Sequence, residues 1–323
     1  MSVPTIDAIL PNDPNTISII QHKATEKGLE LLTLINTKAK WVDKKASPDA
    51  VDEYLQIATS ESLTSGLIMS TLVDIPWAGF AKYGGFMVYD PDAKRVFNNV
   101  QIDNLYTHKC ASEMAIGVLK NSNATIAIAV TGNAMPLNEH VDQVGEVFIG
   151  IAGYNASDEI IFETTVVNVC NIVETDPELA EFKETCSKWY SKIKGDTTGK
   201  TYNSRDATAT ISKEIRYYTA FKAYEQCIKF ITERNPSIPK TILDRKAENA
   251  KKNEQNYHTS IPGPRFDFGG LGKCIKEDEA KCTTPEEGSA PYTLPTSARG
   301  GRRSKKPNQN KRSIRKRSYK RRK

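Results

Sequence analysis

The sequence predicts an α/β fold: a single domain of the three-layer type, with helices packed on a mixed sheet, followed by a disordered basic tail. Short apolar runs with the length of buried strands alternate with segments whose apolar residues recur at helical spacing, an alternation typical of layered α/β domains. Residues 299–323 contain 14 Lys or Arg and no acidic residue, so the tail has too little apolar surface to fold.

The first elements are a helix, a strand and a second helix. Residues 17–35 place apolar side chains at helical spacing, and the polar stretch 38–50, which contains Pro48, is expected to be a loop. Residues 54–58 have the composition of a short buried strand. The second helix is expected over about 62–73.

A second strand and a clear helix start follow. Residues 84–89 predict the strand. Asp90 and Pro91 then combine a favourable N-cap residue with a proline at the first helical position, which predicts a helix beginning there. A further helix is expected over residues 108–119.

The remaining elements complete the sheet and its covering helices. The runs 126–131, 147–151 and 160–169 predict three strands. Residues 177–193 are helical in pattern but charged, and residues 205–231 predict a long helix with an apolar stripe.

Charge and composition indicate the compartment. Residues 1–298 contain 31 basic and 39 acidic side chains, so the overall charge of +6 comes from the tail. The six cysteines form no CxxC pair and the four histidines lack ligand spacing, so we expect no metal site and no cofactor. Residues 1–15 do not resemble a signal peptide, and no apolar run is long enough to span a membrane. We therefore expect an intracellular protein, cytoplasmic or nuclear and not secreted; a large-virus setting would also suit its polar extensions.

Three polar residues suggest hydrolytic chemistry. Ser62 lies at a strand-to-helix junction, and Tyr89 and Lys94 follow it in the chain. No serine–histidine pair is evident, but a lysine kept neutral by burial can act as the base for a hydroxyl nucleophile. This pattern predicts an amidase-type hydrolase. The alternatives are that Ser62 is a helix N-cap, Tyr89 a core residue of its strand and Lys94 a solvated surface amine.

Several short motifs occur in an order found in one known family. Residues 60–66 (SESLTSG) are similar to A-E-S-C-T-G-G, and residues 89–94 (YDPDAK) are similar to Y-S-N-E-A-K. Four further matches lie at 74–79, 112–117, 131–132 with 144–147, and 204–206. Together they resemble the CinA carboxy-terminal domain, or nicotinamide-nucleotide amidase, family. The resemblance covers roughly residues 53–231, with an insertion at about 171–202.

The resemblance implies a substrate and a set of roles. The substrate would be the carboxamide of nicotinamide mononucleotide, and the products nicotinate mononucleotide and ammonia. Ser62 would be the nucleophile and Lys94 the base, with Tyr89 relaying the proton or holding Lys94. The backbone amides of Leu63, Thr64 and Ser65 would form an oxyanion hole. Thr131 and Gly132, at a strand end, would contact the substrate. Arg205 would bind the nucleotide phosphate.

The chain departs from the family pattern at three places. Ser65 replaces a glycine, Asp90 and Pro91 replace Ser-Asn, and residues 135–143 replace a glycine-rich loop. A second hypothesis therefore stays open, in which the CinA-like domain is a non-catalytic scaffold or a nucleic-acid-associated binding or packaging protein.

The organisation along the chain follows from these patterns. We expect a flexible N-terminus over 1–15, the amidase domain over 16–234, a polar linker over 235–298 and the basic tail over 299–323. Phosphate neutralisation by the tail would allow it to bind nucleic acid, and the alternatives are a nuclear import address, attachment to an anionic surface or a solubilising extension. We also expect a homo-oligomer. The cationic residues expected to contact nucleic acid are Arg302, Arg303, Lys305, Lys306, Lys311, Arg312, Arg315, Lys316, Arg317, Lys320, Arg321, Arg322 and Lys323.

Overall fold

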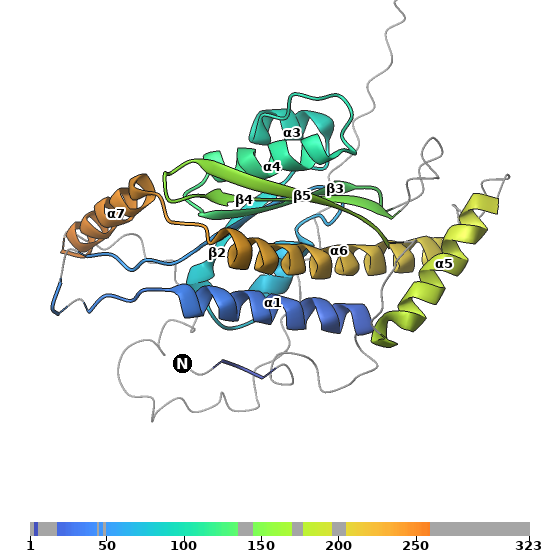
Figure 1. Ribbon diagram of the computed structural model, residues 1–323, viewed down its shortest axis with the longest axis horizontal. Coiled ribbons are helices and arrows are strands. Elements are labelled where there is room, and N and C mark those ends of the chain that lie inside the picture. The colour runs from blue at the N-terminus through green and yellow to red at the C-terminus, as the bar shows by residue number, and fades with distance from the viewer. Residues whose placement is uncertain are drawn as a thin grey trace, which may run out of the picture. The chain divides into compact units, whose positions relative to one another are not determined.

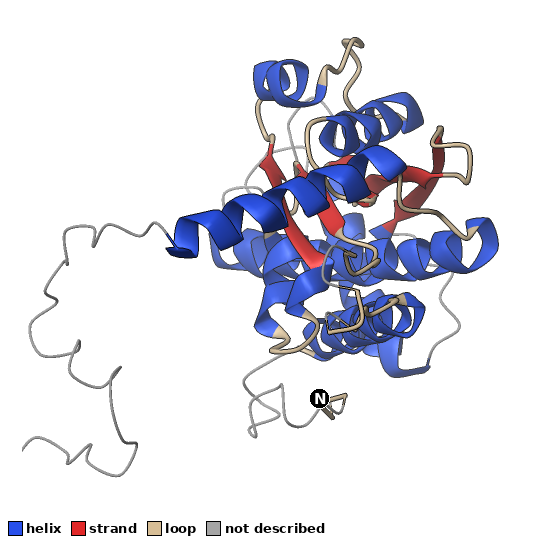
Figure 2. Cartoon of the chain, turned by 90° about the vertical axis from the view of Figure 1, so that its left-hand side faces the viewer, coloured by secondary structure: helices blue, strands red, loops and turns tan. Residues whose placement is uncertain are grey.

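One five-stranded mixed sheet, covered by helices on both faces, organises the described part of the chain (Figure 1, Figure 2). The structure is a computed structural model that describes residues 3–5, 18–43, 45–47, 50–134, 145–169, 177–195 and 205–258. The strands are β1 (Ile57–Glu61), β2 (Lys82–Met87), β3 (Ile126–Gly132), β4 (Glu146–Tyr154) and β5 (Ile160–Asn168). Their order in the sheet is β2-β1-β3-β4-β5.

The strand directions place the carboxyl end of β1 between the carboxyl ends of β2 and β3. β1 pairs in parallel with both β2 and β3, whereas β4 is antiparallel to β3 and to β5. Ligands bind preferentially outside the carboxyl ends of parallel strands in open α/β sheets. The residues directly after β1 therefore lie where a site is expected.

Helices form a layer on each face of this sheet. α4 packs on one face, against β3, β4 and β5, with α3 beside it, and α2 and α6 pack on the other face. α1 packs on α6 outside that layer. The α-helices are α1 (Ile19–Lys38), α2 (Leu67–Asp74), α3 (Pro91–Asn98), α4 (His108–Lys120), α5 (Ala180–Gly195), α6 (Arg205–Arg234) and α7 (Lys240–His258), and short 3₁₀ turns occur at Gly79–Ala81 and Pro177–Leu179.

The predicted fold class is confirmed, and several elements match closely. β3 and α4 occupy the expected ranges, and α3 begins at Pro91 as predicted. Its N-cap is Asp90, whose side chain accepts a hydrogen bond of 2.7 Å from the amide of Asp92. Asp90 thus satisfies one of the amides that a helix start leaves without an intrahelical partner.

Other predicted boundaries were wrong. β1 spans residues 57–61 rather than 54–58, and α2 begins at Leu67 rather than near Ser62. Ser65 and Gly66 have φ of +53° and +93°, and this left-handed backbone places a turn before the helix. α7 lies within the range that we expected to be a polar linker.

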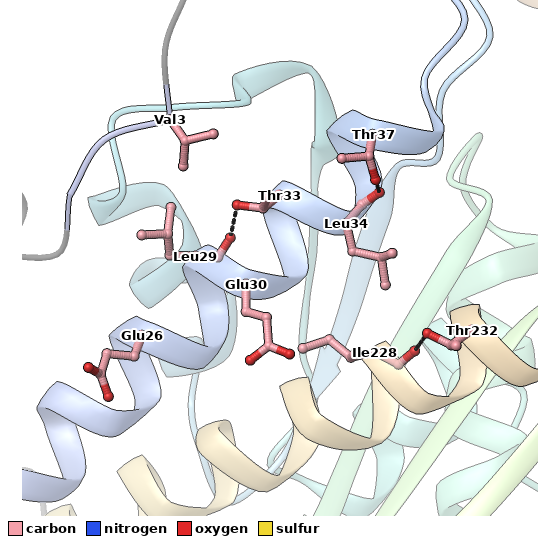
Figure 3. Close-up of a pocket in the computed structure, with 9 residues that line it drawn as sticks. All are labelled: Val3, Glu26, Leu29, Glu30, Thr33, Leu34, Thr37, Ile228 and Thr232. Carbon is pink, nitrogen blue, oxygen red and sulfur yellow. Dashed lines mark hydrogen bonds between the residues drawn. The ribbon is translucent and has the colours of Figure 1, made fainter.

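A groove runs between α1 and α6, on the side away from the sheet (Figure 3). Its volume is about 690 Å³. The hydroxyls of Thr33, Thr37 and Thr232 donate to carbonyls of their own helices, at 2.7, 2.7 and 2.9 Å. Because these donors are satisfied locally, the threonines contribute mainly their methyl groups to the groove.

Two classes of feature are absent from the described residues. None of the helices in this part of the chain is both long and apolar enough to cross a bilayer. Within the same residues, no group of three or more His, Cys, Asp or Glu side chains is placed to hold a metal ion.

We predict that Gly117→Ala destabilises the fold, because α4 contacts α3 closely at this residue. A Cβ on Gly117 would lie 2.1 Å from the carbonyl oxygen of Asn98 and 2.6 Å from its Cα, both of which are backbone atoms. Overpacking costs about 1–3 kcal/mol, which outweighs the roughly 1 kcal/mol that alanine contributes through helix propensity. We expect urea denaturation to show a net loss of about 1 kcal/mol.

Gly79→Ala is the matched control, since no atom lies within 4 Å of its added Cβ. A Gly117→Ala protein that is as stable as the Gly79→Ala protein would contradict the close contact between α3 and α4.

Candidate active site

Ser62 is held at the carboxyl end of β1. Its amide donates a hydrogen bond of 3.1 Å to the carbonyl of Val130 in β3, which extends the strand pairing by one residue. The chain then turns through residues 62–66 into α2. The Ser62 side chain is almost completely buried.

Lys94 reaches Ser62 from α3. Its Nζ lies 3.0 Å from the Oγ of Ser62, 2.7 Å from the carbonyl oxygen of Val88 and 3.0 Å from the carbonyl oxygen of Tyr89. The side chain is 2% exposed, an uncommon state for a lysine. The structure therefore brings together the two residues, 32 positions apart, that the sequence analysis paired.

The three contacts of Lys94 suit an uncharged amine. A neutral amine has two N–H donors, which the carbonyls of Val88 and Tyr89 accept, and one lone pair, which then faces the Ser62 hydroxyl. Burial lowers the pKa of Lys94, while Cys110 and Asp90 act in the opposite direction. Burial also raises the pKa of Cys110 to about 11, so that its thiol is uncharged near neutral pH and opposes the effect little.

The turn after Ser62 offers two backbone donors. The amide of Ser65 closes the turn by donating to the carbonyl of Ser62 at 3.2 Å, so it is not available as the oxyanion donor that we predicted. Within the described part of the chain, the amides of Leu63 and Thr64 meet no acceptor. Two adjacent amides without acceptors beside the Ser62 hydroxyl are the kind of donors from which an oxyanion hole is built.

Glu61 fixes this turn to α2, a role that the sequence analysis missed. Its buried carboxylate accepts hydrogen bonds of 3.0 Å from the amides of Ile68 and Met69. It thereby caps the start of α2, where Gly66 has no side chain to do so. The hydroxyl of Tyr224 in α6 donates to the carbonyl of Ile68 at 2.6 Å and secures the same end of the helix.

A cavity of about 190 Å³ opens beside the Ser62–Lys94 pair. Tyr89 lines it with a side chain that is 71% exposed, and it is the carbonyl of Tyr89, not its hydroxyl, that contacts Lys94. Gly132 also lines it, where a Cβ would lie 2.4 Å from the carbonyl oxygen of Glu146. The full lining is Ser62, Leu63, Tyr89, Pro91, Lys94, Leu105, Tyr106, Gly132, Asn133, Ala134 and Arg216.

Two other predicted substrate contacts lie elsewhere. Thr131 is fully buried and donates a hydrogen bond of 2.8 Å to the carbonyl of Leu105, so it supports the cavity wall from behind. Arg205 is the first residue of α6, and its side chain lies outside the described residues. The loop 135–143 and the tail 299–323 also lie outside them.

Arg216 is the cationic residue of the cavity that the sequence analysis did not identify. It projects from α6, and its Nε is buried without a hydrogen-bond partner in the described structure. Arginine presents a planar set of donors suited to carboxylate or phosphate. The apolar stripe of α6, which includes Ile215 and Tyr218, had suggested only core packing, and no separate signal marked Arg216.

Comparison with known proteins assigns the family. Residues 41–174 match the CinA C-terminal domain. A CinA-like protein of Chlorobium limicola is 39% identical over 119 residues, which are 35% of this chain and 28% of that protein. The chain spans about a quarter of the length of such relatives.

A shorter relative is covered more fully. The protein MG115 homolog of Mycoplasma pneumoniae is 35% identical over 119 residues, which are 35% of this chain and 74% of that protein. Among solved structures, the competence/damage inducible protein CihA of Agrobacterium tumefaciens is 22% identical, with a TM-score of 0.41 over 66% of this chain and 98% of that one. From the family match and the extent of the Mycoplasma alignment, we conclude that this chain belongs to the CinA C-terminal domain family.

Proposed function

We propose that this protein hydrolyses a carboxamide through Ser62 and Lys94, and that its substrate is nicotinamide mononucleotide. One observation carries the proposal: the buried Nζ of Lys94 lies 3.0 Å from the Oγ of Ser62, with two carbonyls accepting its N–H groups. The family relationship supports the substrate class, since nicotinamide-nucleotide amidases are CinA-family members. The products are nicotinate mononucleotide and ammonia.

In the first half of the reaction, the substrate acylates Ser62. The hydroxyl of Ser62 gives its proton to the lone pair of Lys94 while Oγ bonds to the carboxamide carbon. The carbon–nitrogen bond then breaks, and the departing nitrogen takes the proton back from Lys94. Ammonia leaves, and the acyl group remains on Ser62 as an ester.

In the second half, water releases the acyl group. Water bonds to the ester carbon and gives a proton to Lys94, the bond to Oγ breaks, and Ser62 regains that proton. The net change is the addition of water to an amide to give a carboxylic acid and ammonia. The amides of Leu63 and Thr64, which meet no acceptor in the described structure, would stabilise the oxyanion in both halves, and one such donor is worth about 3 kcal/mol.

The cavity accommodates the reacting end of the substrate. Sites that enclose a whole ligand have volumes of roughly 300–1,000 Å³, larger than the 190 Å³ here. We assign the carboxamide and its ring to this cavity, between Ser62 and the side chains of Tyr89 and Tyr106. Among the described residues that line the cavity, Arg216 is suited to bind the substrate's phosphate. Arg205 remains a candidate for a second contact with the phosphate.

A non-catalytic function as a scaffold is the alternative. The replaced loop 135–143 favours it, because a changed wall can close a site whose catalytic residues persist. Ammonia release from nicotinamide mononucleotide by the purified full chain separates the two functions, and a protein that releases none supports the scaffold.

We predict that Ser62→Ala and Lys94→Met each reduce ammonia release at least about a hundredfold, because they remove the nucleophile and its base. Release is measured with an enzyme-coupled ammonia assay. Lys82→Met is the matched control: Lys82 is also a partly buried lysine whose pKa is lowered by burial, and its Nζ donates to the carbonyl of Ile75 far from Ser62. The proposed mechanism would be excluded if Ser62→Ala and Lys94→Met released ammonia as fast as an active Lys82→Met protein.

We predict that Arg216→Ala raises the KM for the mononucleotide about tenfold or more, with a smaller effect on kcat, because it removes a charge-assisted contact to the phosphate. Steady-state kinetics on nicotinamide mononucleotide and on nicotinamide riboside, which lacks the phosphate, test this. The variant should discriminate less between the two substrates. A loss of the same size on both substrates would argue against phosphate binding, and Arg205→Ala shows whether that residue contributes instead.

We further propose that the basic tail attaches the domain to nucleic acid by neutralising phosphates. Deleting residues 299–323 is predicted to abolish retention of the full chain on DNA or RNA columns at low salt. The intact chain should elute as salt increases, with little preference for sequence. Retention that survives the deletion would refute this role.

A further inference from the structure

A second hydrogen bond joins β1 to α3 beside the Ser62–Lys94 contact. The hydroxyl of Ser60 donates to Oδ1 of Asn98 at 3.0 Å, and both side chains are buried. Ser60 precedes Ser62 by two residues in the strand direction, and Asn98 follows Lys94 by four residues on α3. Strand residues two apart share a face, as do helix residues four apart.

The distance between the two contacts is similar along β1 and along α3. Two residues of extended strand span about 6.8 Å, and four residues of α-helix span about 6 Å. Ser60 can therefore meet Asn98 at the same time as Ser62 meets Lys94. Moving α3 along β1 by one residue would break both contacts together.

Asn98 also ties α3 to the helix behind it. Its Nδ2 donates to the carbonyl of Met114 in α4 at 3.2 Å, so both functional ends of its amide are bonded. The backbone of Asn98 lies directly against Gly117 of the same helix. Asn98 thus joins three elements, β1, α3 and α4, at one buried position.

We propose that the Ser60–Asn98 hydrogen bond sets the position of Lys94 relative to Ser62, so that Asn98 is a positioning residue for the reaction. This inference rests on the proposed function in that it takes Ser62 as the nucleophile. Apolar packing alone tolerates small shifts, but a buried polar pair is satisfied in one arrangement and costs free energy in others. Any displacement of α3 would leave the Ser60 hydroxyl and the Asn98 amide without partners.

The test uses Ser60→Ala and Asn98→Leu in the full chain. Ser60→Ala removes one hydroxyl and leaves the bond to Met114, so it is the variant more certain to fold. The readout is the rate at which a fluorophosphonate probe labels Ser62, followed by mass spectrometry as a function of pH. This rate reports the serine and its base without depending on any amide substrate.

We expect Asn98→Leu to slow labelling about tenfold to a hundredfold, since a misplacement of about 1 Å has effects of this size. Ser60→Ala should slow it less. The pH midpoint of labelling should move upward in both variants, because a less buried Lys94 returns toward the ordinary pKa of a lysine. A role in stability alone would lower Tm and leave the midpoint unchanged.

Asn121→Ala is the matched control. Its Nδ2 donates to the carbonyl of Phe97 at 2.7 Å, so it also joins α4 to α3, without contacting β1. We expect Ser62 of this variant to be labelled at the wild-type rate and with the wild-type pH midpoint. Labelling rates and midpoints of Ser60→Ala and Asn98→Leu that equal those of Asn121→Ala would overturn the proposal.

The outcomes for the wild type separate this inference from the proposed function. If the wild type is labelled at Ser62 but releases no ammonia from nicotinamide mononucleotide, only the proposed substrate is excluded. The comparison of the variants then still decides the role of Asn98. A wild type whose Ser62 is not labelled overturns both the nucleophile and its positioning.

Discussion

The burial of the Lys94 amine is the constraint on which the candidate site depends. An ammonium group loses its hydration when it is buried, and among the described residues no carboxylate forms an ion pair with Lys94: its three hydrogen-bond contacts are two carbonyls and a hydroxyl. In the neutral form, the two carbonyls accept the N–H groups of Lys94 and its lone pair is left for Ser62. The burial that disfavours a protonated Lys94 is therefore also what its proposed role as a base requires.

The fold holds this arrangement by close backbone approaches. Gly117 allows α3 to lie on α4, and at Gly150 of β4 an added Cβ would lie 2.4 Å from the carbonyl oxygen of Ala111 in α4. α4 thus lies closely against both the sheet and α3, and α3 carries Lys94. On the other face, Glu61 fixes α2 and the turn that contains the free amides. The proposed nucleophile and oxyanion donors consequently lie together in the turn after β1, and the proposed base reaches them from α3.

The regular elements were predictable and the connections were not. Periodicity located β3 and α4, and the Asp90–Pro91 pair located the start of α3, because each of these signals is local. The turn before α2 was missed, since a left-handed Ser65 has no local signature. Residue types suggested the pairing of Ser62 with Lys94 and motif resemblance supported it, but spacing along a chain does not show which side chains meet. Arg216 was missed since its place in the cavity depends on how α6 packs across the sheet.

A direct measurement of the Lys94 pKa tests the account most sharply. Titration of the lysine side-chain amines by ¹⁵N NMR, with Lys94→Met to assign the signal, gives this value in the full chain. The account predicts a pKa below the ordinary lysine value of 10.5, so that the neutral, basic form gains population at lower pH than in an unperturbed lysine. A pKa at or above 10.5 would mean that Lys94 is a buried cation that holds Ser62 in place, and would contradict its role as the base.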